Sequence, residues 1–310
     1  MNALILTTVL LALAWFTATN LLASALAWIC GAAVDRRAFQ PSAGVLLAIR
    51  LFPAAASLLS TLALFIPVHW TTEVRGANES FGWTLIAAAA IGLLLLVRSV
   101  ARGIAVARAD RQLRAIERAS PIVSGALESS AVSGMALAGI LRTRVVIDPR
   151  VAAVLSGEEL DVAIAHEMAH RRAVDNLKRW ACHCAPDFFG MTRTSVQLER
   201  AWHVAAESLA DARAANDDDG RALDLASALV KVARLTTAGS GTAVWSTFND
   251  PALLRSRVNQ LTSGAPLPPQ YRPIRTASAA ICLLAGIAVV APHLPHPIHT
   301  LTEAVVAFLP

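Results

Sequence analysis

The chain has 310 residues, of which 55% are hydrophobic and only 16% are charged, and its mean hydropathy is +0.53. This composition excludes an ordinary soluble enzyme. The formal net charge of +5 is compatible with nucleic-acid binding, with attraction to a membrane surface or with topology signals. Long uncharged blocks lie near both termini, whereas most charges lie between about Arg98 and Arg275. The sequence therefore predicts a membrane part and a globular part.

Four apolar segments are predicted to be transmembrane helices: residues 2–34, 51–69, 81–97 and 276–291. The first segment is far longer than the apolar region of a cleaved signal peptide and lacks a basic start, so we expect a retained span. Its only strongly polar interruption, Asn20, is interpreted as a helix–helix contact. Arg50 lies at the edge of the second segment, where its side chain could extend to the interface.

The distribution of arginines predicts the orientation. Arginines lie between the first two spans and again after the third, whereas the second loop contains only Arg75. Because basic loops stay in the cytoplasm, we expect an N-terminus outside a bacterial inner membrane, a cytoplasmic domain over residues 98–275 and a short external tail over residues 292–310. The same rule explains the six arginines from Arg98 to Arg118, so we expect no direct nucleic-acid binding.

The first part of this domain predicts a small antiparallel hairpin. Gly134 and Gly139 bound a short segment, and the β-branched run Val145, Val146 and Ile147 follows it. We expect this last strand to lie at a sheet edge, where it could bind an extended peptide by adding it as a further strand.

The next segment predicts a helix with a metal-binding face. Ser156 and Glu159 form a capping box, so the helix should begin there and continue through the H-E-x-x-H segment. Residues four apart share one face of a helix, so His166 and His170 can present two imidazoles to one metal ion. Glu167 lies beside them, where it could act on a water molecule bound to the metal.

A catalytic zinc ion usually has three protein ligands and an open position, so a third ligand is needed. The helix expected from about Thr194 to Asn216 carries one polar stripe at four-residue steps: Glu199, His203, Glu207 and Asp211. Glu207 could reach the metal, and Asp211 could bind a ligand imidazole. Glu199, next to Arg200, is expected to face solvent. For His203, an oxyanion donor and a simple structural hydrogen bond are both considered.

Together these motifs resemble the BlaR/MecR-type integral-membrane zinc metallopeptidases, the β-lactam-sensing receptors, and more distantly the HtpX-type membrane proteases. The resemblance rests on residues 139–147, 155–160 and 166–177 and on Glu207 with Asp211. It does not extend to the large C-terminal sensor domain that receptors of this group carry.

The resemblance implies a mainly α membrane protein, with a gluzincin-like α+β lobe inserted between the third and fourth of four transmembrane helices. It implies that one Zn²⁺ ion is bound by His166, His170 and Glu207, that Glu167 is the general base and that Asp211 is a supporting residue. Asp175, within the family-like run after the motif, would anchor the end of the motif helix.

The predicted function is zinc-dependent hydrolysis of a protein or peptide substrate at the cytoplasmic face, with a cytoplasmic transcriptional regulator as one partner to consider. The alternative is a signalling receptor or scaffold whose zinc lobe is structural or inactive. The intact ligands His166, His170 and Glu207 argue against that alternative. A transporter is disfavoured, because the predicted spans contain no acidic residue.

Overall fold

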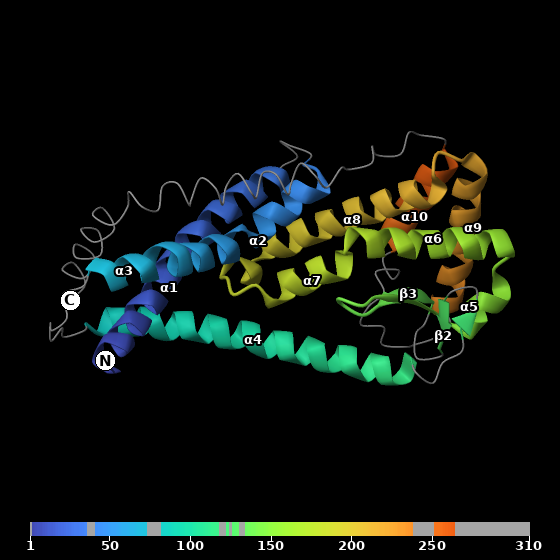
Figure 1. Cartoon of the computed structure of the whole chain (residues 1–310). Helices are drawn as coiled ribbons and strands as arrows, with labels where there is room; N and C mark the ends of the chain where they lie inside the picture. Colours follow the sequence, from blue (N-terminus) through green and yellow to red (C-terminus); the bar gives the residue numbers. More distant parts are fainter. Residues whose placement is uncertain are drawn as a thin grey trace. The chain divides into compact units, whose positions relative to one another are not determined.

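The computed structural model describes residues 2–35, 41–72, 82–117, 122–123, 126–129, 134–237 and 251–263. These residues are mainly helical (Figure 1) and divide into two compact units. The first unit contains the described residues up to Arg102 together with Cys182–Arg200, and the second contains those of Gly103–Ala181 and Ala201–Tyr271. The predicted domain 98–275 is therefore interrupted, because Cys182–Arg200 belong with the membrane helices.

Among the described residues, three helical stretches are long and apolar enough to cross a membrane, as expected for a membrane protein. They are formed by α1 (Asn2–Asp35), by α2 (Ala43–Leu59) with the π-helical turn η1 (Ser60–Phe65) and α3 (Ile66–Thr72), and by α4 (Trp83–Glu117). The second stretch begins eight residues before the predicted position 51, so Arg50 lies inside the helix and not at its edge. The predicted fourth span, 276–291, lies outside the described residues.

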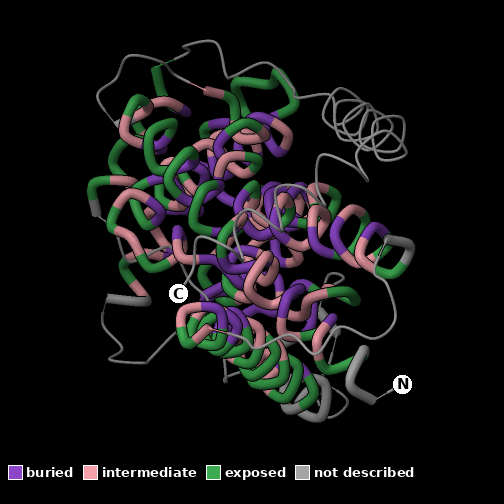
Figure 2. The backbone as a smooth tube through the Cα atoms, turned by 90° about the vertical axis from the view of Figure 1, so that its left-hand side faces the viewer, coloured by how far each residue is buried: buried purple, intermediate pink, exposed green. Residues whose placement is uncertain are grey.

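Small and hydroxylated residues allow the membrane helices to approach closely. A Cβ atom added at Gly92 of α4 would lie 2.7 Å from the carbonyl oxygen of Leu13 in α1. Thr17 of α1 donates a hydrogen bond to the carbonyl of Ala88 at 2.8 Å. Such contacts replace the hydrophobic effect as the source of helix association in lipid. Figure 2 shows how buried and exposed residues alternate along the helical turns of the chain.

The second unit contains a four-stranded sheet in the order β1-β2-β4-β3. Its strands are β1 (Ile122–Val123), β2 (Ala126–Glu128), β3 (Met135–Ala138) and β4 (Arg144–Ile147). The predicted hairpin is confirmed, since β3 and β4 pair antiparallel with Leu137 opposite Val145.

The predicted edge position of Val145, Val146 and Ile147 is wrong. β4 lies between β3 and β2, and its other side pairs in parallel with β2 through Leu127 and Val146. β2 has only three residues, which is too short for the alternation of apolar and polar residues that predicts a strand. β3 is an edge strand of this sheet. Asn176 donates hydrogen bonds to the carbonyl of Leu137 in β3 at 2.8 Å and to the carbonyl of Gly139, just after the strand, at 2.7 Å.

The remaining elements are helical: α5 (Pro149–Val154), α6 (Gly157–Ala173), α7 (Asp175–Cys184), the 3-10 turn η2 (Phe189–Met191), α8 (Arg193–Ala215), α9 (Asp219–Thr237) and α10 (Pro251–Thr262). One hydrophobic cluster includes Val162 of α6, Leu225 of α9 and Leu261 of α10. A second cluster joins the sheet to α5 and α9. Both clusters fix α6, the helix that carries the H-E-x-x-H segment.

Candidate metal centre

The start of α6 is held by reciprocal hydrogen bonds. The Ser156 amide donates to Glu159 Oε2 at 2.8 Å, and the Glu159 amide donates to Ser156 Oγ at 3.2 Å, which confirms the predicted capping box. The same Glu159 carboxylate accepts hydrogen bonds from Ser227 and Lys231 of α9 at 2.6 and 2.7 Å. Glu159 therefore caps α6 and also binds it to α9.

Val174 ends α6 and turns the chain back toward the centre. Its φ of 53° is in the left-handed region, which is unusual for a β-branched residue. α7 begins directly afterwards at Asp175, whose Oδ2 lies 2.8 Å from His170 Nδ1. Lys178 donates to the other oxygen of Asp175 at 2.8 Å. The turn therefore places a fixed carboxylate behind the imidazole of His170.

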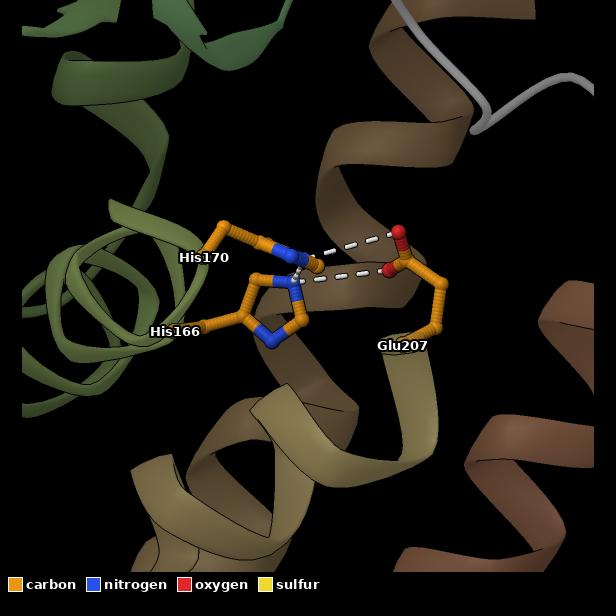
Figure 3. A group of neighbouring side chains, drawn as sticks. All are labelled: His166, His170 and Glu207. Carbon is orange, nitrogen blue, oxygen red and sulfur yellow. Dashed lines mark hydrogen bonds and ion pairs between the residues drawn. The ribbon is translucent and has the colours of Figure 1, made fainter. Parts of the chain in front are cut away.

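Three side chains from two helices converge on one point, as Figure 3 shows. The Nε2 atoms of His166 and His170 are 3.2 Å apart, and Glu207 places Oε2 3.5 Å from His166 Nε2 and Oε1 3.5 Å from His170 Nε2. Zinc ligands at bond lengths of 2.0–2.1 Å in a tetrahedron are separated by about 3.3 Å. All three residues are buried. This group could hold a metal ion, and the donor set fits zinc.

Each imidazole is held from behind by a carboxylate. Asp211 Oδ1 lies 2.9 Å from His166 Nδ1, as Asp175 does for His170. Because an ionised carboxylate can only accept, the hydrogen bond to Asp175 places the ring hydrogen of His170 on Nδ1, and the Nε2 lone pair of a neutral ring then points to the shared centre. The predicted supporting positions of Asp175 and Asp211 thus correspond to direct contacts with the two histidines.

The charges of the cluster shift its pKa values strongly. Burial opposes protonation of His170, but hydrogen bonds to Asp175 and Glu207 outweigh it and raise its pKa to about 10. Burial would also raise the pKa of Glu207, yet hydrogen bonds to both imidazoles and the charge of Arg257 hold it well below its usual range. The cluster therefore attracts positive charge, either protons or a cation.

Glu167 lies next to His166 on α6 and is also buried. Burial is the main reason why the pKa of its carboxyl group is raised, although the nearby imidazoles act in the opposite direction. A raised pKa makes a carboxylate a stronger proton acceptor. The residue therefore has the electrostatic setting of a general base.

Arg257 is part of the centre, and the sequence analysis missed it. This residue of α10 is 5% exposed and donates to both oxygens of Asp211, at 2.6 and 2.8 Å, while its Nη1 lies 2.9 Å from Glu207 Oε2. It thereby holds Glu207 and Asp211 of α8 in place. The sequence contains one signal for this role, because Arg257 lies in α10 between Leu254 and Leu261, which pack in the core. A charged residue on an apolar stripe needs a buried partner.

Two residues of the predicted α8 stripe lie elsewhere. His203 lies one turn before Glu207, with its ring centroid 4.8 Å from that of Trp202, and it is not in the converging group. Its role as an oxyanion donor stays a prediction. Glu199 was expected to face solvent, but its Oε1 accepts a hydrogen bond from Arg50 Nε at 2.5 Å. The side chain of Glu199 is 36% exposed, so the expectation holds in part, but Arg50 lies inside a membrane helix and needs an anionic partner.

A hollow of about 470 Å³ lies between β4 and α6. Among the described residues, its lining includes Arg142, Arg144 and Arg171, together with the apolar side chains of Val145 and Met168, and no acidic residue. The α6 residues of this lining flank His170 in the sequence. The hollow therefore offers a basic surface next to the helix that carries the centre.

Comparisons with protein-family models, with curated proteins and with solved structures found no match to this chain. The buried ligands, the two carboxylates behind the imidazoles and the neighbouring Glu167 are the features that bear on function.

Proposed function

We propose that the protein is a membrane-bound zinc endopeptidase. The observation that carries the proposal is the convergence of two imidazole Nε2 atoms and one carboxylate at 3.2–3.5 Å, near the spacing of ligands on tetrahedral zinc. Two histidines and one glutamate form a typical catalytic set, which leaves a fourth position open. A structural zinc site, as a scaffold would need, normally has four protein ligands, so the ligand number favours catalysis.

Each residue of the centre has a separate task in peptide hydrolysis. A zinc ion held by His166, His170 and Glu207 would supply a Lewis acid and a water molecule of lowered pKa. Glu167 takes a proton from the attacking water and gives it to the leaving amine, and its raised pKa makes it a stronger proton acceptor. Asp175 and Asp211 fix the orientation of the imidazoles.

The substrate is proposed to be a protein segment with acidic residues near the cleaved bond. The basic hollow at Arg142, Arg144 and Arg171 supports this substrate class, since none of the described residues that line it is acidic. The resemblance to BlaR/MecR-type peptidases supports cleavage of a cytoplasmic transcriptional regulator as part of signal transduction. The distribution of arginines around the spans supports a cytoplasmic centre in a bacterial inner membrane.

The test is the zinc content and proteolytic activity of the detergent-purified chain, measured with an unstructured casein as substrate. The wild type should bind about one zinc ion, and His166→Ala and Glu207→Ala should lose it. Glu167→Gln should keep the zinc but lose about 10²–10⁴-fold in rate, because only the proton acceptor is removed. The control is Glu158→Gln, an exposed acid on the same helix.

Two outcomes would contradict the proposal. A well-folded wild type without zinc would exclude the metal centre itself. A wild type that binds zinc but shows the same casein turnover as Glu167→Gln would exclude catalysis and favour the scaffold.

A further inference from the structure

A buried arginine of the first unit binds residues 182–199, a segment that comprises the end of α7, the connection to α8 and the first turns of α8. Arg50 lies within a candidate membrane span and is 4% exposed. Its Nη2 donates to the carbonyl of Cys182 at 2.7 Å, its Nη1 to Asp187 at 3.1 Å and its Nε to Glu199 at 2.5 Å. A charge inside a membrane helix is costly, so three partners from one segment indicate a specific role.

α1 binds the same segment with neutral groups. Asn20, which is fully buried, donates to the carbonyl of Pro186 at 2.9 Å and accepts from the amide of Phe188 at 3.2 Å. Ser24, one turn further along α1, accepts from the amide of Phe189 at 3.2 Å. We refer to Asn20, Ser24 and Arg50 as the clamp. The clamp satisfies backbone groups that would otherwise be buried without partners.

The clamp reaches the metal centre along a single helix. α8 runs without interruption from Arg193 to Ala215 and carries both Glu199, the partner of Arg50, and Glu207, the metal-ligand candidate. Eight residues of helix span about 12 Å. A rotation of about 10° around the helix axis would move a carboxylate 5–6 Å from that axis by about 1 Å. A shift of this size is enough to impair catalysis strongly.

We propose that Arg50 is a positioning residue for the metal centre. By holding Asp187 and Glu199 together, it fixes the rotation of α8 around its own axis and thereby the position of the Glu207 carboxylate. This inference rests on the proposed zinc peptidase function. It gives the membrane helices a task beyond anchoring, because a change in α2 would be transmitted to a metal ligand.

The test compares zinc affinity, kcat and KM for casein in single and double variants. Glu199→Gln removes the charge of a side chain that is 36% exposed, so the fold should survive. We expect zinc affinity and kcat to fall by roughly 5–10-fold with little change in KM, since a misplaced ligand acts on the reaction and not on substrate contacts. Arg50→Lys should act in the same direction, because it keeps the charge but cannot reach all three partners.

The double variant Arg50→Lys/Glu199→Gln should be no worse than the more affected single variant, since both changes act through one contact. Arg200→Gln is the matched control, because it removes an exposed charge from the next position of α8. A merely structural clamp would lower the melting temperature of Arg50→Lys without changing zinc affinity or kcat.

That result, in a wild type that binds zinc and cleaves casein, would overturn this inference alone. A zinc-free, inactive wild type would overturn the proposed function and this inference with it.

Discussion

Both units bury a cluster of polar side chains, but only one cluster is complete without a ligand. In the clamp, Arg50 donates to three acceptors, and Asn20 donates to two and accepts from a backbone amide. In the metal centre, the Nδ1 atoms of His166 and His170 face carboxylates, and their Nε2 atoms face each other at 3.2 Å. Two lone pairs at that distance repel unless a proton or a cation lies between them.

The comparison teaches that burial of charge alone does not identify a binding site. A cluster whose donors and acceptors match fixes the structure, and a cluster with converging acceptors needs a cation. The two should therefore respond to different perturbations. Changes in the metal centre should act directly on zinc affinity, and changes in the clamp should act on it only through α8.

The largest effect should come from the carboxylates behind the imidazoles. Asp175→Asn and Asp211→Asn should each weaken zinc binding by about 10–100-fold, because the amide stabilises the ligand imidazole less than the carboxylate does. Competition with a chelator of known affinity measures the change.

The control for this prediction is Asp161→Asn on α6, whose exposed carboxylate pairs with Arg221 at 3.2 Å on the surface. It should leave zinc affinity unchanged, since surface ion pairs contribute little. If Asp161→Asn weakened zinc binding as much as Asp211→Asn did, general electrostatics and not imidazole orientation would explain the effect.

The next effect is the pH dependence of zinc binding. The pKa of His170 is about 10 in the zinc-free fold, against an ordinary value of 6.5, so its imidazole carries a proton at pH 7. Zinc must displace that proton. Its affinity should therefore rise by about tenfold per pH unit for each proton released, below the raised pKa.

Calorimetric titration of the zinc-free chain in two buffers with different ionisation enthalpies counts the released protons. A binding heat that is independent of the buffer, together with a zinc affinity that does not change from pH 6 to 8, would show that zinc binding releases no proton and would refute this prediction.

The sequence predicts the histidine pair of the candidate metal centre well because the geometry of that pair is local. The i and i+4 spacing of His166 and His170 is fixed by one helix, and the capping box places its start at Gly157. The four-residue stripe of α8 likewise identifies Glu207 and Asp211. Each of these relations holds within a single helix, whatever the rest of the fold does.

The relations that the sequence missed connect distant parts of the chain. Arg257 meets Asp211 across 46 positions, and Arg50 meets Glu199 across 149. The parallel pairing of β2 with β4 depends on a strand of three residues, too short for a periodic signal. Such contacts follow from how helices and strands pack, and no local pattern encodes them.

The smallest expected effect concerns the turn that places Asp175 behind His170. Val174 has a φ of 53°, and a left-handed backbone costs a β-branched residue about 1–2 kcal/mol. Val174→Gly should relieve this cost. The greater conformational entropy of glycine in the unfolded chain offsets part of the gain, so we expect the protein to be stabilised by about 1 kcal/mol or less. The measurement is thermal unfolding in detergent at saturating zinc.

Val204→Gly, at a similarly exposed valine within α8, is the control and should destabilise by about 1 kcal/mol, because glycine is a poor helix former. Zinc affinity should stay unchanged in Val174→Gly if the turn only has to bring Asp175 back to His170. A weaker zinc affinity in a more stable protein would instead mean that the stiff backbone of Val174 holds the carboxylate against the imidazole. The strained backbone of Val174 would then serve the metal centre, because it would lower the stability of the protein and in return fix the position of the Asp175 carboxylate oxygen.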